Sequence, residues 1–193
     1  MLRVLIIIAA VLTSSCANNV SEPFCDNPDS KILNCFCRTN EIRCRGGSNA
    51  SYNAVWKLFE TVPDLIYLSF FSNFNYLPTQ MLAALPNLQD YRCSLTNTTL
   101  VPKYSFNNLY KLEVIDLSYN KLTTIEGHAF HNLPNLERIF LFSNKIKTMD
   151  ENAFYTLPKL TVLVLSNNSL EKLPNFVESS KLLNDFIISS KIN

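Results

Sequence analysis

The strongest constraint on the fold of this chain is a pattern that recurs about every 24 residues from Leu65 onward. Its clearest form is L-x-x-[LI]-x-L-x-x-N-x-[LI]. Copies begin at Leu65, Leu88, Leu112, Leu136 and Leu160, and a truncated sixth copy begins at Leu183. Such a period predicts an array of stacked repeats in which each repeat packs only on its neighbours.

The alternation within each copy predicts a short strand. Side chains at positions 1, 4 and 6 should enter a common core, and those at positions 3 and 5 should point to the opposite face. Stacked copies then form a parallel sheet along the concave side. Asparagine at position 9 should satisfy backbone groups where the chain turns out of the strand. Phenylalanine at position 19 should fill the convex side of the core; it occurs as Phe106, Phe130 and Phe154.

The concave strand face is where such arrays usually bind, so positions 3, 5 and 7 supply the candidate ligand-binding residues. These are Tyr67, Arg92, Asp116, Arg138, Phe140, Phe142, Val162 and Val164. The aromatic and valine members should form an exposed apolar patch, with charged residues beside it that could pair with one another. The alternative is that the valines reflect only β propensity and the charges only solvate the face.

Residues 1–17 have the pattern of a signal peptide: Arg3, then an apolar run over 4–12, then small residues before Ala17. The run is too short to span a bilayer, and no second apolar stretch follows it. A membrane anchor is the rival interpretation. We therefore expect an extracellular chain with no membrane insertion.

Four cysteines, Cys25, Cys35, Cys37 and Cys44, lie in the segment 18–64 that precedes the repeats. In an oxidising compartment such a cluster usually forms two disulfides, and a zinc site is the alternative. Cys93 falls at position 6 of its repeat, which predicts a buried free thiol. Pairing of Cys93 with another chain would require its strand to open.

The repeat pattern resembles that of extracellular leucine-rich-repeat proteins, and the cysteines at 25–44 resemble their N-terminal cap. The resemblance implies an α/β leucine-rich-repeat solenoid, or horseshoe, with a parallel concave sheet and an irregular convex side. It also implies a disulfide-bonded cap over the first strand, with Cys25 bound to Cys37 and Cys35 to Cys44. The domains would be a signal peptide at 1–17, a cap at 18–64, and five repeats plus a truncated sixth at 65–193.

The cluster ending at Ile42 to Cys44, together with Trp56 to Phe59, is also similar to arthropod relatives of the non-catalytic leucine-rich-repeat subunit of shrimp luciferase. That likeness implies no light-producing activity. The C-terminal cysteine cap common in these families has no counterpart here, so we expect a partial chain, a frayed last repeat or a dimer formed through that end.

Glycosylation is expected because four N-x-[ST] sequons follow the signal peptide. They begin at Asn19, Asn49, Asn97 and Asn167.

Other chemistry has little support. The 17 basic and 16 acidic residues nearly cancel, which argues against nucleic acid as a partner. The two histidines, His128 and His131, fall at convex positions 17 and 20 without metal-ligating partners, and we expect them to be solvated. No nucleophile, base and orienting group share a face, so we expect no enzyme, no cofactor and no metal.

The sequence therefore predicts a secreted, non-catalytic recognition module that binds an extracellular or cell-surface protein on its concave face. The alternative is an accessory or matrix subunit that stabilises a partner protein through the uncapped C-terminal end.

Overall fold

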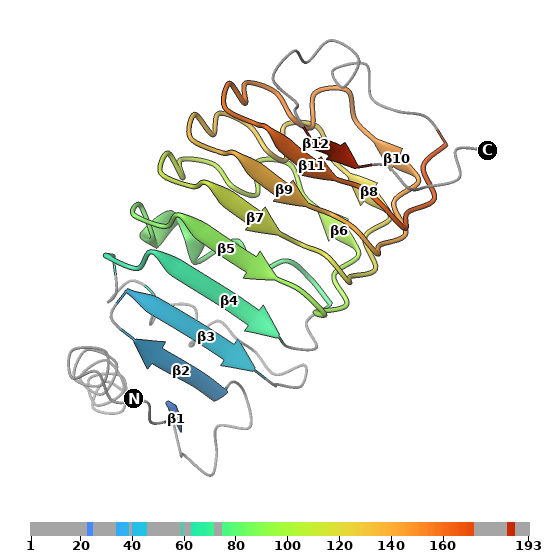
Figure 1. The fold of residues 1–193 in the computed structure, drawn as a ribbon. Helices are drawn as coiled ribbons and strands as arrows, with labels where there is room; N and C mark the ends of the chain where they lie inside the picture. Colours follow the sequence, from blue (N-terminus) through green and yellow to red (C-terminus); the bar gives the residue numbers. More distant parts are fainter. Residues whose placement is uncertain are drawn as a thin grey trace.

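The computed structural model describes residues 23–24, 34–38, 40–45, 59, 63–71, 75–171 and 185–187. Within these residues the chain forms a solenoid dominated by one sheet of nine strands in the order β1-β2-β3-β4-β5-β7-β9-β11-β12 (Figure 1). Several predicted features lie outside the described residues: the signal peptide, Cys25, and the sequons at Asn19 and Asn49. The same holds for Asn73, the position-9 asparagine of the first repeat.

The large sheet begins with antiparallel strands and continues with parallel ones. Strand β1 (Pro23–Phe24) pairs antiparallel with β2 (Asn34–Arg38), and β2 pairs antiparallel with β3 (Glu41–Arg45). From β3 onward every pairing is parallel. The parallel strands after β3 are β4 (Tyr67–Phe71), β5 (Asp90–Cys93), β7 (Val114–Asp116), β9 (Arg138–Phe140), β11 (Val162–Val164) and β12 (Asp185–Ile187).

The convex side is irregular, as the sequence predicts. A second parallel sheet runs in the order β10-β8-β6. Its strands are β6 (Leu100–Val101), β8 (Thr124–Ile125) and β10 (Thr148–Met149). Apart from these, the described convex segments contain turns and the 3-10 helix η2 (Leu82–Ala84), and the elements described include no α-helix.

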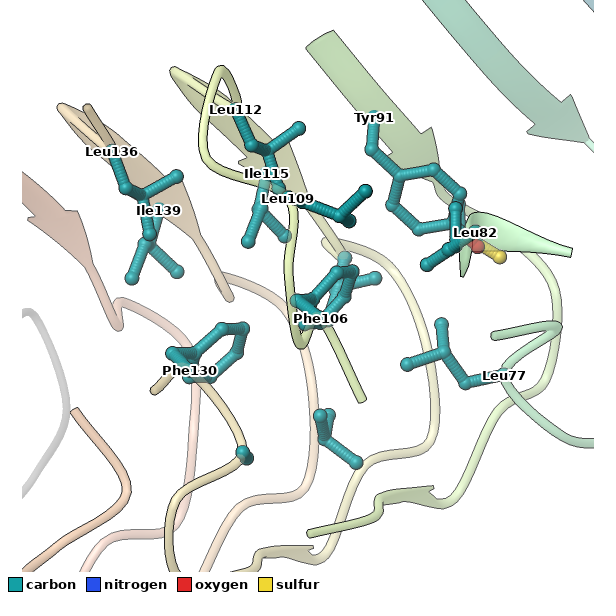
Figure 2. Packing of buried hydrophobic residues seen from close by; sticks show 14 of the residues in the cluster. Leu77, Leu82, Tyr91, Phe106, Leu109, Leu112, Ile115, Phe130, Leu136 and Ile139 are labelled. Carbon is teal, nitrogen blue, oxygen red and sulfur yellow. The ribbon is translucent and has the colours of Figure 1, made fainter. Parts of the chain in front are cut away.

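Each strand of the parallel array lies at the register that the repeat predicts. The position-3 residues Tyr67, Asp90, Val114, Arg138, Val162 and Asp185 are successive partners across the sheet. Leucine and isoleucine at positions 1, 4 and 6 are buried; Leu112, Ile115, Leu136 and Ile139 have no exposed surface. Figure 2 shows these side chains in matching rows from neighbouring repeats.

Aromatic rings join the repeats through the core. Phe106 and Phe130 stack with their ring centroids 5.5 Å apart, and Phe130 and Phe154 stack at 5.1 Å. Tyr91, which replaces the usual leucine at position 4, meets the edge of Phe106 at 5.6 Å. The prediction that position 19 fills the convex core is confirmed.

The asparagines at position 9 form a ladder of side-chain to backbone hydrogen bonds. Asn144 donates from Nδ2 to the carbonyl oxygen of Leu117 in the preceding repeat and to that of Leu141 in its own, both at 3.0 Å. Its Oδ1 accepts the backbone N–H of Leu122 at 3.0 Å. Asn120 and Asn168 make equivalent bonds.

Thr96 stands where the second repeat lacks this asparagine. It has no exposed surface, and its hydroxyl lies 2.9 Å from Oδ1 of Asn120 and 2.8 Å from Oγ1 of Thr98. The buried hydroxyl of Thr96, with polar partners of its own, therefore stands where the other repeats have the asparagine amide.

The predicted cap disulfide between Cys35 and Cys44 is present, and it joins the antiparallel neighbours β2 and β3. The other implied pair, Cys25 with Cys37, cannot be placed because Cys25 lies outside the described residues. β3 pairs in parallel with β4, so the cap extends the sheet of the repeats.

Replacing Asn144 by alanine should lower the free energy of unfolding by at least about 2 kcal/mol, because each buried backbone group left without a partner costs about 1–3 kcal/mol. Urea unfolding of the purified chain measures the change. Asn107→Ala, at an exposed position, is the control and should change stability by less than about 0.5 kcal/mol. If both substitutions lowered the free energy of unfolding by the same amount, the hydrogen bonds of Asn144 would not be what stabilises the turn.

Candidate functional site

The concave face of the large sheet carries the predicted ligand-binding residues in two rows. One row holds position 3 of each repeat, and the other holds position 5, where Ser69, Arg92, Asp116, Phe140, Val164 and Ile187 are successive partners. Residues that pair across strands point to the same face. The prediction that these side chains share one surface agrees with the strand register.

The C-terminal half of this face is apolar. Val162 and Val164 of β11 are the partners of Arg138 and Phe140 of β9, and the two valines and Phe140 are all half-buried. Position 7 adds the half-buried Phe142 at the ends of the strands. These four apolar side chains, here called the apolar patch, are Phe140, Phe142, Val162 and Val164.

Tyr119 extends the apolar patch toward the rim. Its side chain is 53% exposed, and its ring meets that of Phe142 edge to face with centroids 4.9 Å apart. The repeat alignment did not single out Tyr119, because position 8 has no preferred residue type in the pattern. The sequence signal for Tyr119 is an aromatic residue at a position that varies from one copy to the next.

The predicted row of mutually paired charges forms only in part. Arg92 makes a bidentate ion pair with Asp90 of its own strand, from Nε to Oδ1 at 2.9 Å and from Nη2 to Oδ2 at 2.8 Å. Oδ1 of Asp116 instead accepts hydrogen bonds from the backbone N–H of Ser118 at 2.9 Å and from its hydroxyl at 2.5 Å. Arg138 is exposed and forms no ion pair with any described residue.

The hydrogen bonds that Arg92 donates to Asp90, together with the charge of Asp90, raise the pKa of Arg92 above its ordinary value despite partial burial. Arg92 is therefore a permanent positive charge on this face, as arginine is in proteins generally. Arg138, by contrast, is exposed beside the apolar patch and has no ion-pair partner in the described part of the chain.

Tyr67 occupies a position between two guanidinium groups. The Cζ atom of Arg92 lies 5.6 Å from the centroid of its ring, and that of Arg43 lies 5.1 Å away. Arg43 belongs to β3 of the cap and is itself paired with Glu41. Arg43 was not among the predicted ligand-binding residues because it precedes the repeats, although the alternation Glu41-Ile42-Arg43-Cys44-Arg45 is a strand signal.

Cys93 is the buried free thiol that the register predicts. It has no exposed surface, and its Sγ lies 3.5 Å from Oγ1 of Thr96. Burial raises the pKa of Cys93 to about 12. Burial also raises the pKa of the adjacent Tyr91. A thiol that is neither exposed nor ionised at neutral pH is not a nucleophile.

The expectation of solvated histidines is wrong. His128 and His131 are half-buried, with ring centroids 5.2 Å apart, and they pack between Tyr104 and Tyr155. Tyr104 stacks on His128 at 5.6 Å, and Tyr155 stacks on His131 at 5.7 Å. Neighbouring repeats bring these positions together, so the rings cover each other. Within the described residues, no group of three or more histidine, cysteine or acidic residues could hold a metal ion.

Two of the predicted sequons can be located. Asn167 is exposed at position 8, and its Nδ2 lies 3.4 Å from Oγ of Ser143. Asn97 is half-buried. A glycan on Asn167 would stand beside the end of β11 and the apolar patch.

Comparison with known proteins identifies the repeats. The family described as leucine rich repeat matches residues 94–146 and 135–184. The described part of the chain contains no helix with the length and apolar character that crossing a membrane requires. A comparison with curated proteins found no match, so the resemblance to the luciferase subunit gains no support.

Two solved structures are similar to this chain, and the first of them has its fold. One, from the Toll–Spätzle complex of Drosophila, has 21% sequence identity and a TM-score of 0.61 over 70% of this chain. The other, the leucine-rich-repeat domain of APL1B, has 24% identity and a TM-score of 0.46 over 55% of this chain. The present chain spans 19% of the first structure's chain and 30% of the second's. At this identity the likeness shows the fold alone.

Cys93 should resist alkylation in the folded protein, because its thiol is buried and stays protonated well above neutral pH. Mass spectrometry of the peptide that carries Cys93, after iodoacetamide treatment at pH 8, measures the reaction. Modification should be at least about tenfold faster in 8 M urea than in buffer. Equally fast modification in buffer would show that the strand opens and that the thiol is available to another chain.

Proposed function

We propose that this leucine-rich-repeat solenoid is an extracellular, non-catalytic module that binds a protein ligand on the concave face of its large sheet. The observation that carries the proposal is the apolar patch. Phe140, Val162 and Val164 lie on adjacent strands without full burial, beside the exposed charge of Arg138. An apolar centre with a charged margin is typical of protein interfaces.

The surrounding fold supports a binding role because it holds these side chains on rigid, hydrogen-bonded strands. β9 and β11 are paired over three residues each, and their opposite faces are anchored by the buried Ile139 and Leu163. Side chains that are already positioned lose less entropy on binding. The concave face is therefore suited to recognition without rearrangement of the sheet.

The extracellular location is proposed from the signal-peptide pattern and is supported by the Cys35–Cys44 disulfide, since such bonds persist in oxidising compartments. Glycosylation at Asn97 and Asn167, and at Asn19 and Asn49, is part of the same proposal. The Toll structure was solved as a complex with Spätzle, which is an example of this fold in contact with a protein.

The accessory or matrix subunit remains the second candidate, together with a dimer formed through the C-terminal repeat. Only the strand β12 is described in that region, and no described contact favours either assembly. The concave face is preferred because the apolar patch and the exposed Arg138 lie together on it.

The double variant Phe140→Asp with Arg138→Glu should weaken ligand binding by at least about 30-fold, because it places charge in the apolar patch and reverses its margin. Capture of ligand from the source organism's extracellular fluid, followed by titration of the captured protein, measures the loss. Circular dichroism should show an unchanged fold, since both side chains lie outside the core.

Tyr110→Asp with Lys111→Glu is the matched control. It makes the same change in charge on exposed residues of the turn before β7 and should leave the affinity unchanged. Retention of full affinity by the concave variant would overturn the proposed site, and equal losses in both variants would show a general effect of charge.

A further inference from the structure

The N-terminal half of the concave face differs from the apolar patch in being rich in arginine. The charged residues on β2, β3, β4 and β5 are Arg38, Arg43, Arg45, Arg92, Glu41 and Asp90, which is four arginines against two acids. Arg38, Arg43 and Arg45 are exposed. The cap therefore contributes basic side chains to the same sheet that carries the repeats.

Arg43 and Arg92 are held in place rather than free to move. Each is paired with the acid two residues earlier on its own strand, and each lies over the ring of Tyr67 on the strand between them. Their side chains nevertheless remain 59% and 40% exposed. The Nε and Nη2 atoms of Arg92 donate to Asp90, and no described residue bonds to the Nη1 atom of Arg92. Both guanidinium groups therefore retain donors that face solvent.

Ser69 provides an independent observation at the same place. It lies between Arg43 and Arg92 in the position-5 row, and its side chain has no exposed surface. Its Oγ atom has no hydrogen-bond partner among the described residues. Buried hydroxyl groups are nearly always satisfied, because desolvation without a partner is costly.

We propose that Arg43, Tyr67, Arg92 and Ser69 form a subsite for a carboxylate side chain in an acidic segment of the protein ligand. The carboxylate accepts hydrogen bonds from the outer edges of both guanidinium groups, whose planar geometry matches it. With a small shift of the covering side chains, Ser69 donates its hydroxyl to the same group. This inference rests on the proposed function and assigns part of the ligand's chemistry.

The arrangement favours isolated carboxylates over a dense polyanion. Glu41 and Asp90 lie in the position-3 row directly beside the position-5 row of Arg43 and Arg92, so a sulfated glycan that covers both rows would meet repulsion from the acids next to the arginines. An acidic peptide can place single carboxylates between them and continue toward the apolar patch. The cap thereby becomes a binding element as well as a cover for the first repeat.

The test uses as its probe a short peptide in which glutamate alternates with serine, titrated into the full chain at low and moderate salt. We expect weak binding that decreases with salt and that falls at least about tenfold in Arg43→Gln with Arg92→Gln. Lys145→Gln with Lys147→Gln removes the same charge from exposed residues beyond β9 and should leave binding unchanged. No binding by the parent chain, or equal losses in both variants, would overturn the subsite.

Two further variants distinguish the loss of a binding contact from misfolding of the protein. Arg43→Lys with Arg92→Lys keeps the charge and the fold but loses the planar fork, so it should still weaken binding severalfold. Ser69→Ala should weaken binding without lowering the melting temperature, because it removes a hydroxyl that has no hydrogen-bond partner among the described residues. Unchanged binding in Ser69→Ala would overturn the placement of the carboxylate between the arginines.

The remaining outcomes separate this inference from the proposed function. Tighter binding of heparin than of the glutamate–serine peptide, lost in the same arginine variant, would assign the site to a sulfated glycan and overturn the acidic peptide. The Phe140→Asp with Arg138→Glu variant could lose the protein ligand while the Arg43→Gln with Arg92→Gln variant still binds it with full affinity. That result would support the concave binding site and overturn the carboxylate subsite.

Discussion

The asparagine ladder is the interaction on which the rest of the solenoid depends. A chain that leaves a strand by a tight inward turn buries backbone N–H and C=O groups that no sheet neighbour can reach. Asn120, Asn144 and Asn168 satisfy these groups in their own turn and in the preceding one. Each amide therefore fixes the spacing between two repeats as well as the shape of one turn. Parallel strands in matched register follow, and with them a continuous concave face.

Because each repeat contacts only its neighbours, the ends of the array need separate treatment. At the N-terminal end the chain changes from antiparallel to parallel pairing at β3, and the Cys35–Cys44 disulfide ties β3 to β2. This arrangement covers the edge of β4 with a hydrogen-bonded strand and keeps its register. The concave face consequently starts in the cap and continues into the repeats through the pairing of β3 with β4.

The two halves of that face have different character for a physical reason. In the first half, arginine and acid alternate on single strands, so Arg92 and Arg43 find partners close by and stack on Tyr67. In the second half, valine and phenylalanine lie opposite each other, and Arg138 has no acid within reach among the described residues. A ligand that spans both halves would meet ordered charge at one end and apolar surface at the other.

The repeat period by itself determined the strand register, the inward leucines, the stacked phenylalanines and the burial of Cys93, since these depend on interactions between equivalent positions of adjacent copies. Only the tertiary structure decided which concave charges pair, because Asp116 bonds locally to Ser118, whereas Arg43 reaches Tyr67 from outside the repeats. It also decided that His128 and His131 are packed rather than solvated, since their neighbours Tyr104 and Tyr155 come from other repeats. Periodicity specifies what every copy shares, and contacts between unlike side chains at variable positions depend on the geometry that stacking creates.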